Sequence, residues 1–321
     1  MILPVLRRAW KKYAVEITVG SVGLIAMNLI FLAGAFRQGT TVTREAAGQL
    51  GDFVGGFVGP SFSLLGIVLL IRTLKDQRTS AEIQSFENKY FELLRLHRDN
   101  VEEIDLQGAS GRKLFVILLR ELRCALEILD ELIVTQNAVL TREERLHVAY
   151  YCVFFGVGPN SSRTLKEELS EFPGGLIDAL EAVLNNKETK ARVRNQRRFK
   201  FIPFEGHQSR LGHYYRHLYQ TVRYVDQQQL EIKHYAHVKT IRAQLSTHEQ
   251  AMLLVNSLTP LGRNWWRNDL IVKYKLVKNL PRHFFDETEI DMRTLFPQNY
   301  FEWEERAISR TPSSSEPSAA N

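Results

Sequence analysis

The stretch ITVGSVGLIAMNLIFLAGAF, residues 17–36, and the stretch FVGGFVGPSFSLLGIVLLI, residues 53–71, decide the fold of this chain. Both match the ~20 residues that a helix needs to cross the hydrocarbon core of a bilayer. Neither contains a charged side chain, and both are apolar on every face, whereas a soluble core helix is usually apolar on one side only. The sequence therefore predicts two membrane spans joined as a hairpin.

Two alternatives for these runs stay open. Either run could be the buried core helix of a soluble protein. The first could instead be a cleaved signal peptide, because basic residues precede it and Ala33-Gly34-Ala35 could serve as a cleavage site. Its apolar part is longer than the ~7–15 residues of a signal peptide, and a second apolar run follows it, so the hairpin is the favoured prediction.

The second run contains a glycine-rich segment that ends in a proline. Gly55 and Gly59 form a GxxxG pattern, which allows helices to approach each other closely and is compatible with a homo-oligomer. Pro60 lacks a backbone donor and clashes with the preceding turn, so we expect a kink near Gly56. Gly55, Gly59 and Pro60 are therefore the predicted gating residues of the membrane segment.

Basic residues flank the hairpin at its two outer ends. Arg7, Arg8, Lys11 and Lys12 precede the first run, and Arg72, Lys75 and Arg78 follow the second. The connection over residues 37–52 has balanced charges. Because cytoplasmic flanks carry the excess of Lys and Arg, both termini are expected in the cytoplasm, with residues 37–52 as a short external loop.

The rest of the chain is predicted to be helical. Residues 1–78 form the hairpin with its flanks, residues 79–300 a helical cytoplasmic domain, and residues 301–321 a C-terminal end with a disordered tail from Ser309. Capping boxes at Thr79–Glu82 and Thr141–Glu144 predict helix starts, and Thr247 is expected to cap a helix over 247–257. Helices are also expected over 112–135, 207–228, 230–244 and 269–280. No period-two alternation persists, so the fold class is all-α.

The composition indicates a reducing compartment and offers one basic cluster. Cys124 and Cys152 lie in apolar helical patterns without metal-ligand spacing, so both are expected to be buried thiols. The segment KETKARVRNQRRFK, residues 187–200, contains Arg192, Arg194, Arg197 and Arg198. It could be a solvated loop, or it could contact the phosphates of a nucleic acid or a lipid.

The densest polar and aromatic segment is GHQSRLGHYYRHLYQ, residues 206–220. On a helix, one face would carry His207, Arg210, Tyr214 and His217. His213 and His217 form an i, i+4 pair that could bind a metal if His234, His237 or His248 supplied a third ligand, although no metal or cofactor is the favoured prediction. The segment could also bind a nucleotide, polyanion or partner, or be a tightly packed polar helix.

A ribonuclease is a further alternative. Arg210 precedes His217 by seven residues, a spacing that resembles the Arg-x4–6-His motif of helical HEPN ribonucleases, in which Arg holds the phosphate and His handles protons. The polar residue usual after Arg is replaced here by Leu211. The sequence shows no P-loop, no GxGxxG and no nucleophile elbow, so the chain is more readily explained as a non-enzyme.

Several stretches resemble the family of putative phage abortive-infection proteins, which includes the two-span membrane effector of some retron systems. They are GHQSRLGHYYRHLYQTVRYVD (206–226), Tyr235 with TIRAQLSTHEQAMLLVNSL (240–258), KYKLVKNLP (273–281) and, upstream, FENKYFELLRLHRDNVEEI (86–104). The resemblance covers about residues 10–285 and is strong in the last third. It implies an antiphage effector that kills or arrests the infected cell at the bacterial inner membrane, and it implies no catalytic residues.

Three hypotheses follow. In the first, the helical domain receives a phage-related or partner signal, from nucleic acid or protein, and the spans then oligomerise or open. The candidate signal-coupled residues are His207, Arg210, His213, Tyr214, His217, Arg242 and Gln244. In the second, the chain is a membrane-tethered ribonuclease in which Arg210 and His217 are catalytic and the basic cluster holds RNA. In the third, it is a non-catalytic scaffold at the membrane.

Overall fold

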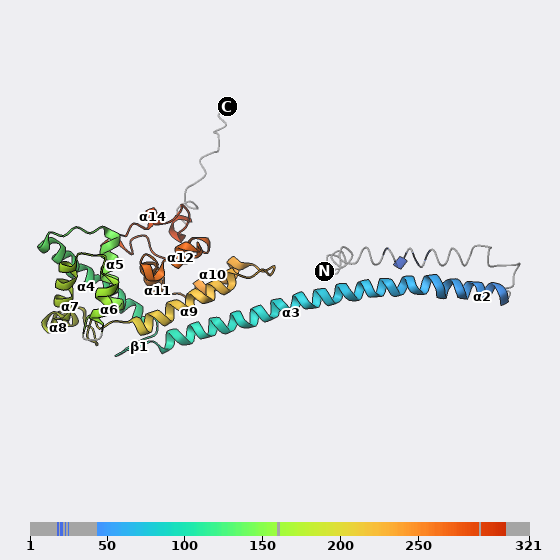
Figure 1. Cartoon of the computed structure of the whole chain (residues 1–321), viewed down its shortest axis with the longest axis horizontal. Coiled ribbons are helices and arrows are strands. Elements are labelled where there is room, and N and C mark those ends of the chain that lie inside the picture. Colours follow the sequence, from blue (N-terminus) through green and yellow to red (C-terminus); the bar gives the residue numbers. More distant parts are fainter. Residues whose placement is uncertain are drawn as a thin grey trace, which may run out of the picture. The chain divides into compact units, whose positions relative to one another are not determined.

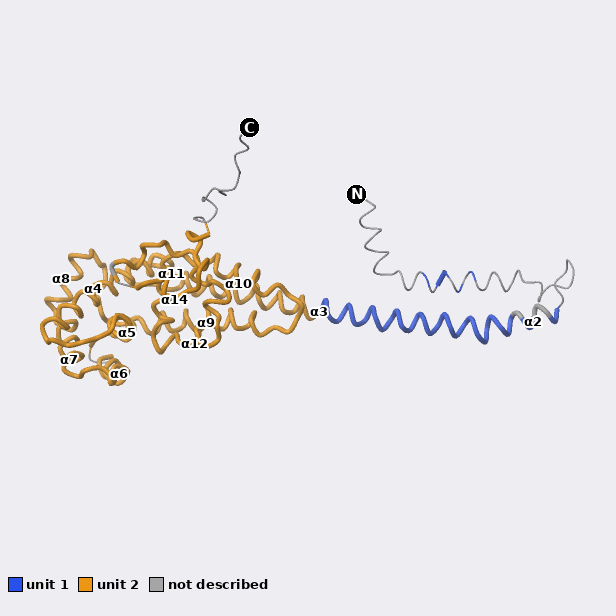
Figure 2. The backbone as a smooth tube through the Cα atoms, turned by 90° about the horizontal axis from the view of Figure 1, so that it is seen from above, with its two compact units in different colours: residues 1–81 blue, residues 82–321 orange. Residues whose placement is uncertain are grey.

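The computed structural model describes residues 44–158, 161–288 and 290–305, together with Thr18, Gly20, Ser21, Gly23 and Ile25. The described part is built from helices and one short two-stranded antiparallel ribbon, which confirms the all-α class (Figure 1). The chain divides into two compact units, Met1–Ala81 and Glu82–Asn321 (Figure 2). Most of the first predicted span and the tail from Ser309 lie outside the described residues.

The elements follow one another along the chain with short connections. In order they are α2 Arg44–Phe53, the π-helical turn η2 Val54–Val58, α3 Gly59–Glu103, β1 Asp105–Leu106, β2 Ala109–Ser110, α4 Lys113–Gln136, α5 Arg142–Phe154, α6 Ser162–Glu168, α7 Gly174–Asn185, α8 Lys187–Arg197, α9 Gln208–Asp226, α10 His234–Ala243, α11 Thr247–Ser257, η3 Pro260–Gly262, α12 Asn264–Arg267, α13 Leu270–Lys273, η4 Asp286–Thr288 and α14 Met292–Leu295.

The second predicted span is helical throughout. The helical run from Gly51 to Glu103 contains an 18-residue window of mean hydropathy 2.1 with none of its residues buried, so it is long and apolar enough to cross a membrane. Exposure of this window argues against a soluble core helix. Of the first span, the five described residues are helical, and a methyl group at Gly23 would lie 3.5 Å from the Phe62 ring.

The glycine-rich segment before Pro60 forms a π-helical turn. The turn covers Val54–Val58, and the Gly59 N–H donates to the carbonyl of Val54, five residues back. A proline ring clashes with the carbonyl four residues earlier, here that of Gly56, and a π turn is a common response to such a disturbance. The irregularity expected at Gly56 is thus a local change from α-helix to π-helix. The second half of the expected external loop, from Arg44, is helical and belongs to α2.

The predicted helix start at Thr79 is wrong, because α3 continues through this position without a break. The segment between Arg72 and Glu82 contains no Gly or Pro that would end a helix. The Thr73 and Ser80 hydroxyls donate to the carbonyls of Leu69 and Asp76, one turn earlier, instead of capping a new helix. α3 therefore contains both the larger part of the apolar span, residues 59–71, and the buried residues Phe86, Tyr90, Leu94, His97 and Val101.

The core of the second unit surrounds two helices that are buried over most of their length. α5 is buried at every position from Leu146 to Phe154, and α11 from Glu249 to Ser257. α4 packs against α5, α7 and α11. Cys124 on α4 and Cys152 on α5 are free and buried, as expected, and burial raises the pKa of both thiols.

The capping signal expected at Thr141 is correct, and the one expected at Thr247 is misplaced by one residue. The Thr141–Glu144 capping box is present, with reciprocal bonds of 3.2 and 2.7 Å. α11 covers 247–257 as predicted, but its N-cap is Ser246, whose partner is Glu249. The expected helix over 269–280 is only the four-residue α13, because the chain turns at Lys275, which has a positive φ of 49°.

Topology gives a direct test of the membrane prediction. Gly48 lies on α2, and no atom lies within 4 Å of a side chain added there, whereas Val139 is 90% exposed in the second unit. Because the two native cysteines are buried, single Gly48→Cys and Val139→Cys substitutions provide clean labelling sites. In bacterial spheroplasts, a membrane-impermeant maleimide is expected to label Gly48→Cys at once and Val139→Cys only after lysis. Equal labelling of both before lysis would contradict the predicted topology.

Candidate functional site

The start of α9 is placed by a close crossing of two backbone segments. Gly156 and Gly206 have φ values of 85° and 87°, and a Cβ atom on either would collide with the backbone of the other segment. The His207 N–H donates to the Phe154 carbonyl at 2.8 Å, and the Val157 N–H donates to Phe204 at 2.7 Å. Only glycine permits this approach, so Gly156 and Gly206 dock α9 on the end of α5.

His207 lies in this crossing and has a structural partner. Its Nε2 lies 2.9 Å from Oε2 of Glu121, a residue of α4 that is completely buried. The other Glu121 oxygen accepts the Phe204 N–H at 2.5 Å. His207 is itself 2% exposed, so it fixes the entry to α9 and is not positioned to meet a soluble ligand from solvent.

Further along α9, a group of polar residues meets from four helices. We call it the central cluster: His97 of α3, Arg112 at the start of α4, Tyr214 and His217 of α9, and Glu249 of α11. Glu249 is completely buried and joins three of its neighbours. It accepts the Tyr214 hydroxyl at 3.3 Å and the Ser246 N–H at 2.8 Å, and its Oε2 lies 3.5 Å from Arg112 Nε. Burial, followed by the Glu249 charge, holds the pKa of Tyr214 well above its usual value.

Two histidines of this cluster stack on each other. The rings of His97 and His217 are 6.1 Å apart and 14° from parallel, and Tyr214 packs 5.3 Å from His97. Neither ring nitrogen of either histidine has a hydrogen-bond partner. Burial lowers the pKa of His97 to about 4, with smaller contributions from the charges of His217 and Arg112. Burial also lowers the pKa of His217, with a smaller contribution from His213. Both rings are consequently neutral near pH 7.

Arg210 and His213 lie at the edge of the cluster. Arg210 Nε donates to the carbonyl of Asp105 in the ribbon at 3.0 Å, and His213 Nε2 lies 3.3 Å from Asn100 Oδ1. The predicted ribonuclease pair, Arg210 and His217, thus lies on one helix, with Arg210 engaged by the ribbon and His217 stacked on His97. His213 and His217, the pair considered as an alternative metal site, also contact different neighbours, and the described residues contain no group of three His, Cys, Asp or Glu that could hold a metal ion.

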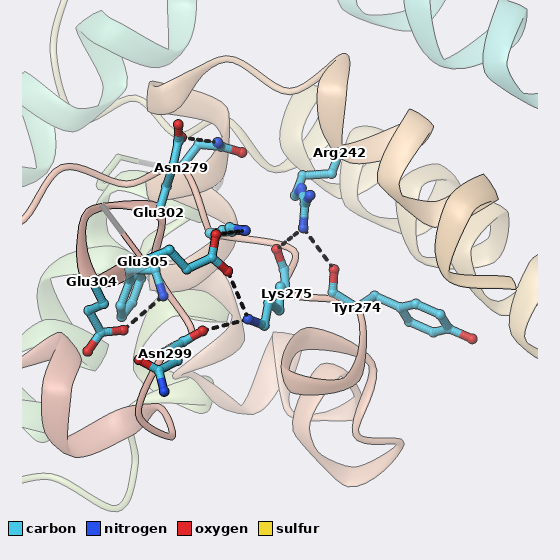
Figure 3. A network of polar contacts seen from close by, with 10 residues as sticks. Arg242, Tyr274, Lys275, Asn279, Asn299, Glu302, Glu304 and Glu305 are labelled. Carbon is cyan, nitrogen blue, oxygen red and sulfur yellow. Dashed lines mark hydrogen bonds and ion pairs between the residues drawn. The ribbon is translucent and has the colours of Figure 1, made fainter. Parts of the chain in front are cut away.

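Arg242, another candidate, acts as a clamp on the C-terminal part of the unit. Its side chain is buried, and Nη1 donates to the carbonyls of Tyr274 and Lys275 at 3.2 and 3.0 Å (Figure 3). Lys275 continues the network through Nζ, which donates to the Asn299 carbonyl and lies 3.4 Å from Glu305. Arg242 therefore stabilises the turn after α13.

Gln244, by contrast, lines a cavity. Its carbonyl accepts Arg112 Nη2 at 2.8 Å, and its Oε1 is buried without a hydrogen-bond partner. The cavity, of about 480 Å3, is also lined by His97 and Arg112 of the central cluster. Of the seven predicted signal-coupled residues, the structure thus brings Tyr214, His217 and Gln244 to one region, places Arg210 and His213 at its edge, and separates His207 and Arg242 from it.

Most of the basic cluster, residues 187–200, forms a helix, whereas one interpretation of the sequence was a solvated loop. α8 covers Lys187–Arg197, with Asn186 as its N-cap. Arg197 pairs with Glu127 of α4, and Arg194 donates to the carbonyls of Phe199 and Lys200. Arg192 and Arg198 are exposed. Arg194 lines a second cavity of about 700 Å3, together with Lys187 and Lys190. Phosphate binding by this cluster stays a prediction.

The central cluster contains residues that the sequence did not indicate. His97 occupies a position of the apolar stripe of α3, where a histidine is itself a signal that a polar partner is near. Glu249 follows Ser246 by three residues, the spacing of a capping box. Arg112 has no local signal, because its partners lie more than a hundred residues away in the sequence.

Protonation of His97 should destabilise the fold. Its pKa of about 4 lies below the value of 6.5 expected for the unfolded chain, so between these pH values the unfolded state binds a proton that the folded state does not. As the pH is lowered from 7.5, the free energy of unfolding should decrease, by about 2 kcal/mol at pH 5 and by about 3 kcal/mol below pH 4.

Urea unfolding of the detergent-purified chain at pH 7.5 and 5 measures this loss, and His97→Leu should be less sensitive to pH by that amount. The groups facing the ring are His217 and Tyr214 of α9 and Arg112 of α4. Equal losses in the wild type and in His97→Leu would show that His97 is not responsible.

Replacing Arg242 should destabilise the protein strongly. Arg242→Met removes two hydrogen bonds to buried carbonyls, with an expected cost of about 2–4 kcal/mol. Arg216→Met is the matched control, because Arg216 is exposed and bonds only to its own turn, with an expected effect within about 0.5 kcal/mol. The midpoint of urea unfolding measures both, and comparable midpoints for the two variants would overturn the role of Arg242 as a clamp.

Comparison with known proteins identifies a relationship for one part of the chain. No curated protein and no solved structure matches the chain. Residues 206–285, which contain α9, α10, α11 and the Arg242 clamp, match the family model described as "Putative phage abortive infection protein". This match confirms the family resemblance over the segment in which it is strongest.

Proposed function

We propose that this protein is a membrane-anchored effector of abortive infection, whose helical domain receives a signal and triggers damage to the bacterial inner membrane. The family match supports an abortive-infection role. The apolar helix supports attachment to a membrane.

The observation that carries the proposal is the continuity of α3. The helix extends from Gly59 to Glu103 and contains residues 59–71 of the apolar span as well as His97 of the central cluster. A helix transmits a displacement along its axis because every turn is hydrogen-bonded to the next. A change in the packing of His97 can therefore act on the membrane segment through the backbone of one element.

The membrane segment contains a feature suited to a change of state. The π turn at Val54–Val58 precedes Pro60, and π turns are often found at functional sites. Gly55 and Gly59 expose backbone and allow close approach of another helix, from the first span or from a second copy of the chain. We infer that this segment rearranges when the effector is activated, which would make the bilayer its target.

The ribonuclease alternative has a weaker geometric basis. The Arg210 guanidinium bonds to the ribbon, and His217 has a lowered pKa with its ring stacked on His97, so proton transfer would need both to be released. The scaffold alternative leaves the two unpartnered histidines of the central cluster without a purpose. The effector hypothesis accounts for both the cluster and the irregular span.

Restoring a regular helix in the membrane segment should abolish killing. The triple substitution Gly55→Ala, Gly59→Ala and Pro60→Ala keeps the span apolar but removes the cause of the π turn. In phage-challenged bacteria that carry this variant, colony formation is expected to equal that of cells with an empty vector. Gly66→Ala is the matched control, because it lies in the same span and a methyl group there meets no atom within 4 Å.

The control should kill as the wild type does, and both variants should reach wild-type levels in the membrane fraction. If the triple variant inserts normally and still kills, the spans are only an anchor, and the proposed mechanism is wrong.

A further inference from the structure

The cavity of about 700 Å3 lies between α8 and the segments that adjoin the crossing of Gly156 and Gly206. Its α8 wall is a single face of the helix, because each residue there stands three or four positions from another. The residues of this face are Lys187, Lys190, Ala191, Arg194 and Asn195. Cavities of roughly 300–1,000 Å3 are typical of sites for small molecules, so this one has room for a metabolite.

Hydrogen bonds hold both walls of this cavity in place. On the wall opposite α8, the Val157 N–H donates to the Phe204 carbonyl at 2.7 Å, and the Gly158 N–H donates to the Ser162 hydroxyl at 3.0 Å. On the α8 side, Asn186 caps the first turn of the helix. Both walls are therefore formed before a ligand arrives, which lowers the cost of ordering the chain on binding.

The cavity contains positive charge that the protein does not compensate. Three cations line it, namely Lys187, Lys190 and Arg194. Glu205 is the one carboxylate among the described lining residues. None of the three cations forms an ion pair with a carboxylate in the described part of the chain, whereas Arg197, on another face of α8, pairs with Glu127. The cavity face of α8 is therefore suited to bind an anion.

Neutral acceptors fix two of these cations. Lys190 Nζ lies 3.5 Å from the Val157 carbonyl and 3.5 Å from Asn185 Oδ1. Arg194 Nε and Nη2 donate to two backbone carbonyls at 3.4 and 3.3 Å. Each group has more N–H donors than these contacts use, so donors of Lys190 and of Arg194 Nη1 remain for a ligand. The protein thus positions the charges without neutralising them.

An apolar area adjoins the cations and defines the rest of the ligand. Its residues are Val157, Ala191, Ile202 and Pro203. Ile202 is 44% exposed, and the amides of Asn185 and Asn195, which can both donate and accept, also line the cavity. The described lining residues include no aromatic side chain, on which the bases of a single nucleic-acid strand usually stack. A compact anion with one apolar ring that has polar edges fits this wall better than a strand does.

We propose that this cavity binds a nucleoside polyphosphate. The phosphates bind to Lys187, Lys190 and Arg194 through charge-assisted hydrogen bonds. The base packs on Ile202 and the neighbouring apolar side chains, and the two asparagine amides meet its polar edges. Volume, charge and the apolar area of the cavity are all used by one molecule of this class.

The inference rests on the proposed function and deepens it, because it gives the signal a chemical class. From Glu205, in the wall of the cavity, the chain passes through the glycine crossing into α9. α9 carries Tyr214 and His217 of the central cluster. One short segment and one helix therefore connect the ligand to the central cluster.

Binding can be measured on the whole chain, purified in a maltoside detergent. ATP supplies phosphates and a base, tripolyphosphate supplies the phosphates alone, adenosine lacks the charge, and a short oligothymidylate represents a nucleic-acid strand. At constant ionic strength, ATP is expected to raise the thermal unfolding midpoint in a saturable way. Tripolyphosphate and the oligothymidylate should act only at higher concentration, and adenosine should have no effect.

Variants locate the site, and the ligand-free unfolding midpoint of each checks that it folds. Lys187→Gln and Lys190→Gln should each weaken ATP binding by about tenfold, through the loss of one charge-assisted contact. Arg192→Gln removes an exposed charge from the same helix outside the cavity, so it should bind ATP as the wild type does. Ile202→Ser should weaken the binding of ATP but not of tripolyphosphate, because it reduces only the apolar area.

The proposal is overturned if ATP leaves the midpoint unchanged, if adenosine acts as strongly as ATP, or if the two lysine variants and Arg192→Gln bind ATP equally well. Tighter binding of the oligothymidylate than of ATP would also overturn it, in favour of a nucleic-acid strand. Because binding is measured on the purified chain without infection or membrane damage, its failure is distinguishable from failure of the proposed function.

Discussion

The helical domain depends on satisfying one completely buried carboxylate, that of Glu249. Its oxygens accept hydrogen bonds from the Ser246 N–H and the Tyr214 hydroxyl and form an ion pair with Arg112. One side chain thus fixes the start of α11, the middle of α9 and the start of α4. Removing a single partner of a buried charge costs roughly 3–5 kcal/mol, because the charge remains in a medium that solvates it poorly. The arrangement of these helices is therefore specified by a polar constraint and not by apolar packing alone.

The same constraint shapes the region around His97. Because Arg112 is held by Glu249 and by the Gln244 carbonyl, it stands beside the cavity at a defined position, and the His97 and His217 rings are kept neutral by burial. His97 lies on the helix that also contains the apolar span. One continuous helix therefore joins the central cluster to the membrane segment.

Sequence reasoning was most successful where a signal is local. The Thr141–Glu144 capping box and the extent of α11 depend on residues three or four apart, and both were predicted correctly. The false helix start at Thr79 shows the limit, since a capping pattern is overridden when nothing interrupts the preceding helix. For the site, Tyr214, His217 and Gln244 could be proposed from their segments, but Arg112 and Glu249 could not be joined to them, because tertiary packing alone brings them together.

The most direct test of the account follows membrane potential and RNA integrity together in phage-challenged bacteria that carry the wild-type protein. A voltage-sensitive dye reports the potential, and ribosomal RNA from the same culture is examined at each time. Because the membrane is the proposed first target, we expect the potential to collapse while the RNA is still intact. Growth arrest with a preserved potential and degraded RNA would contradict it and would favour the tethered ribonuclease.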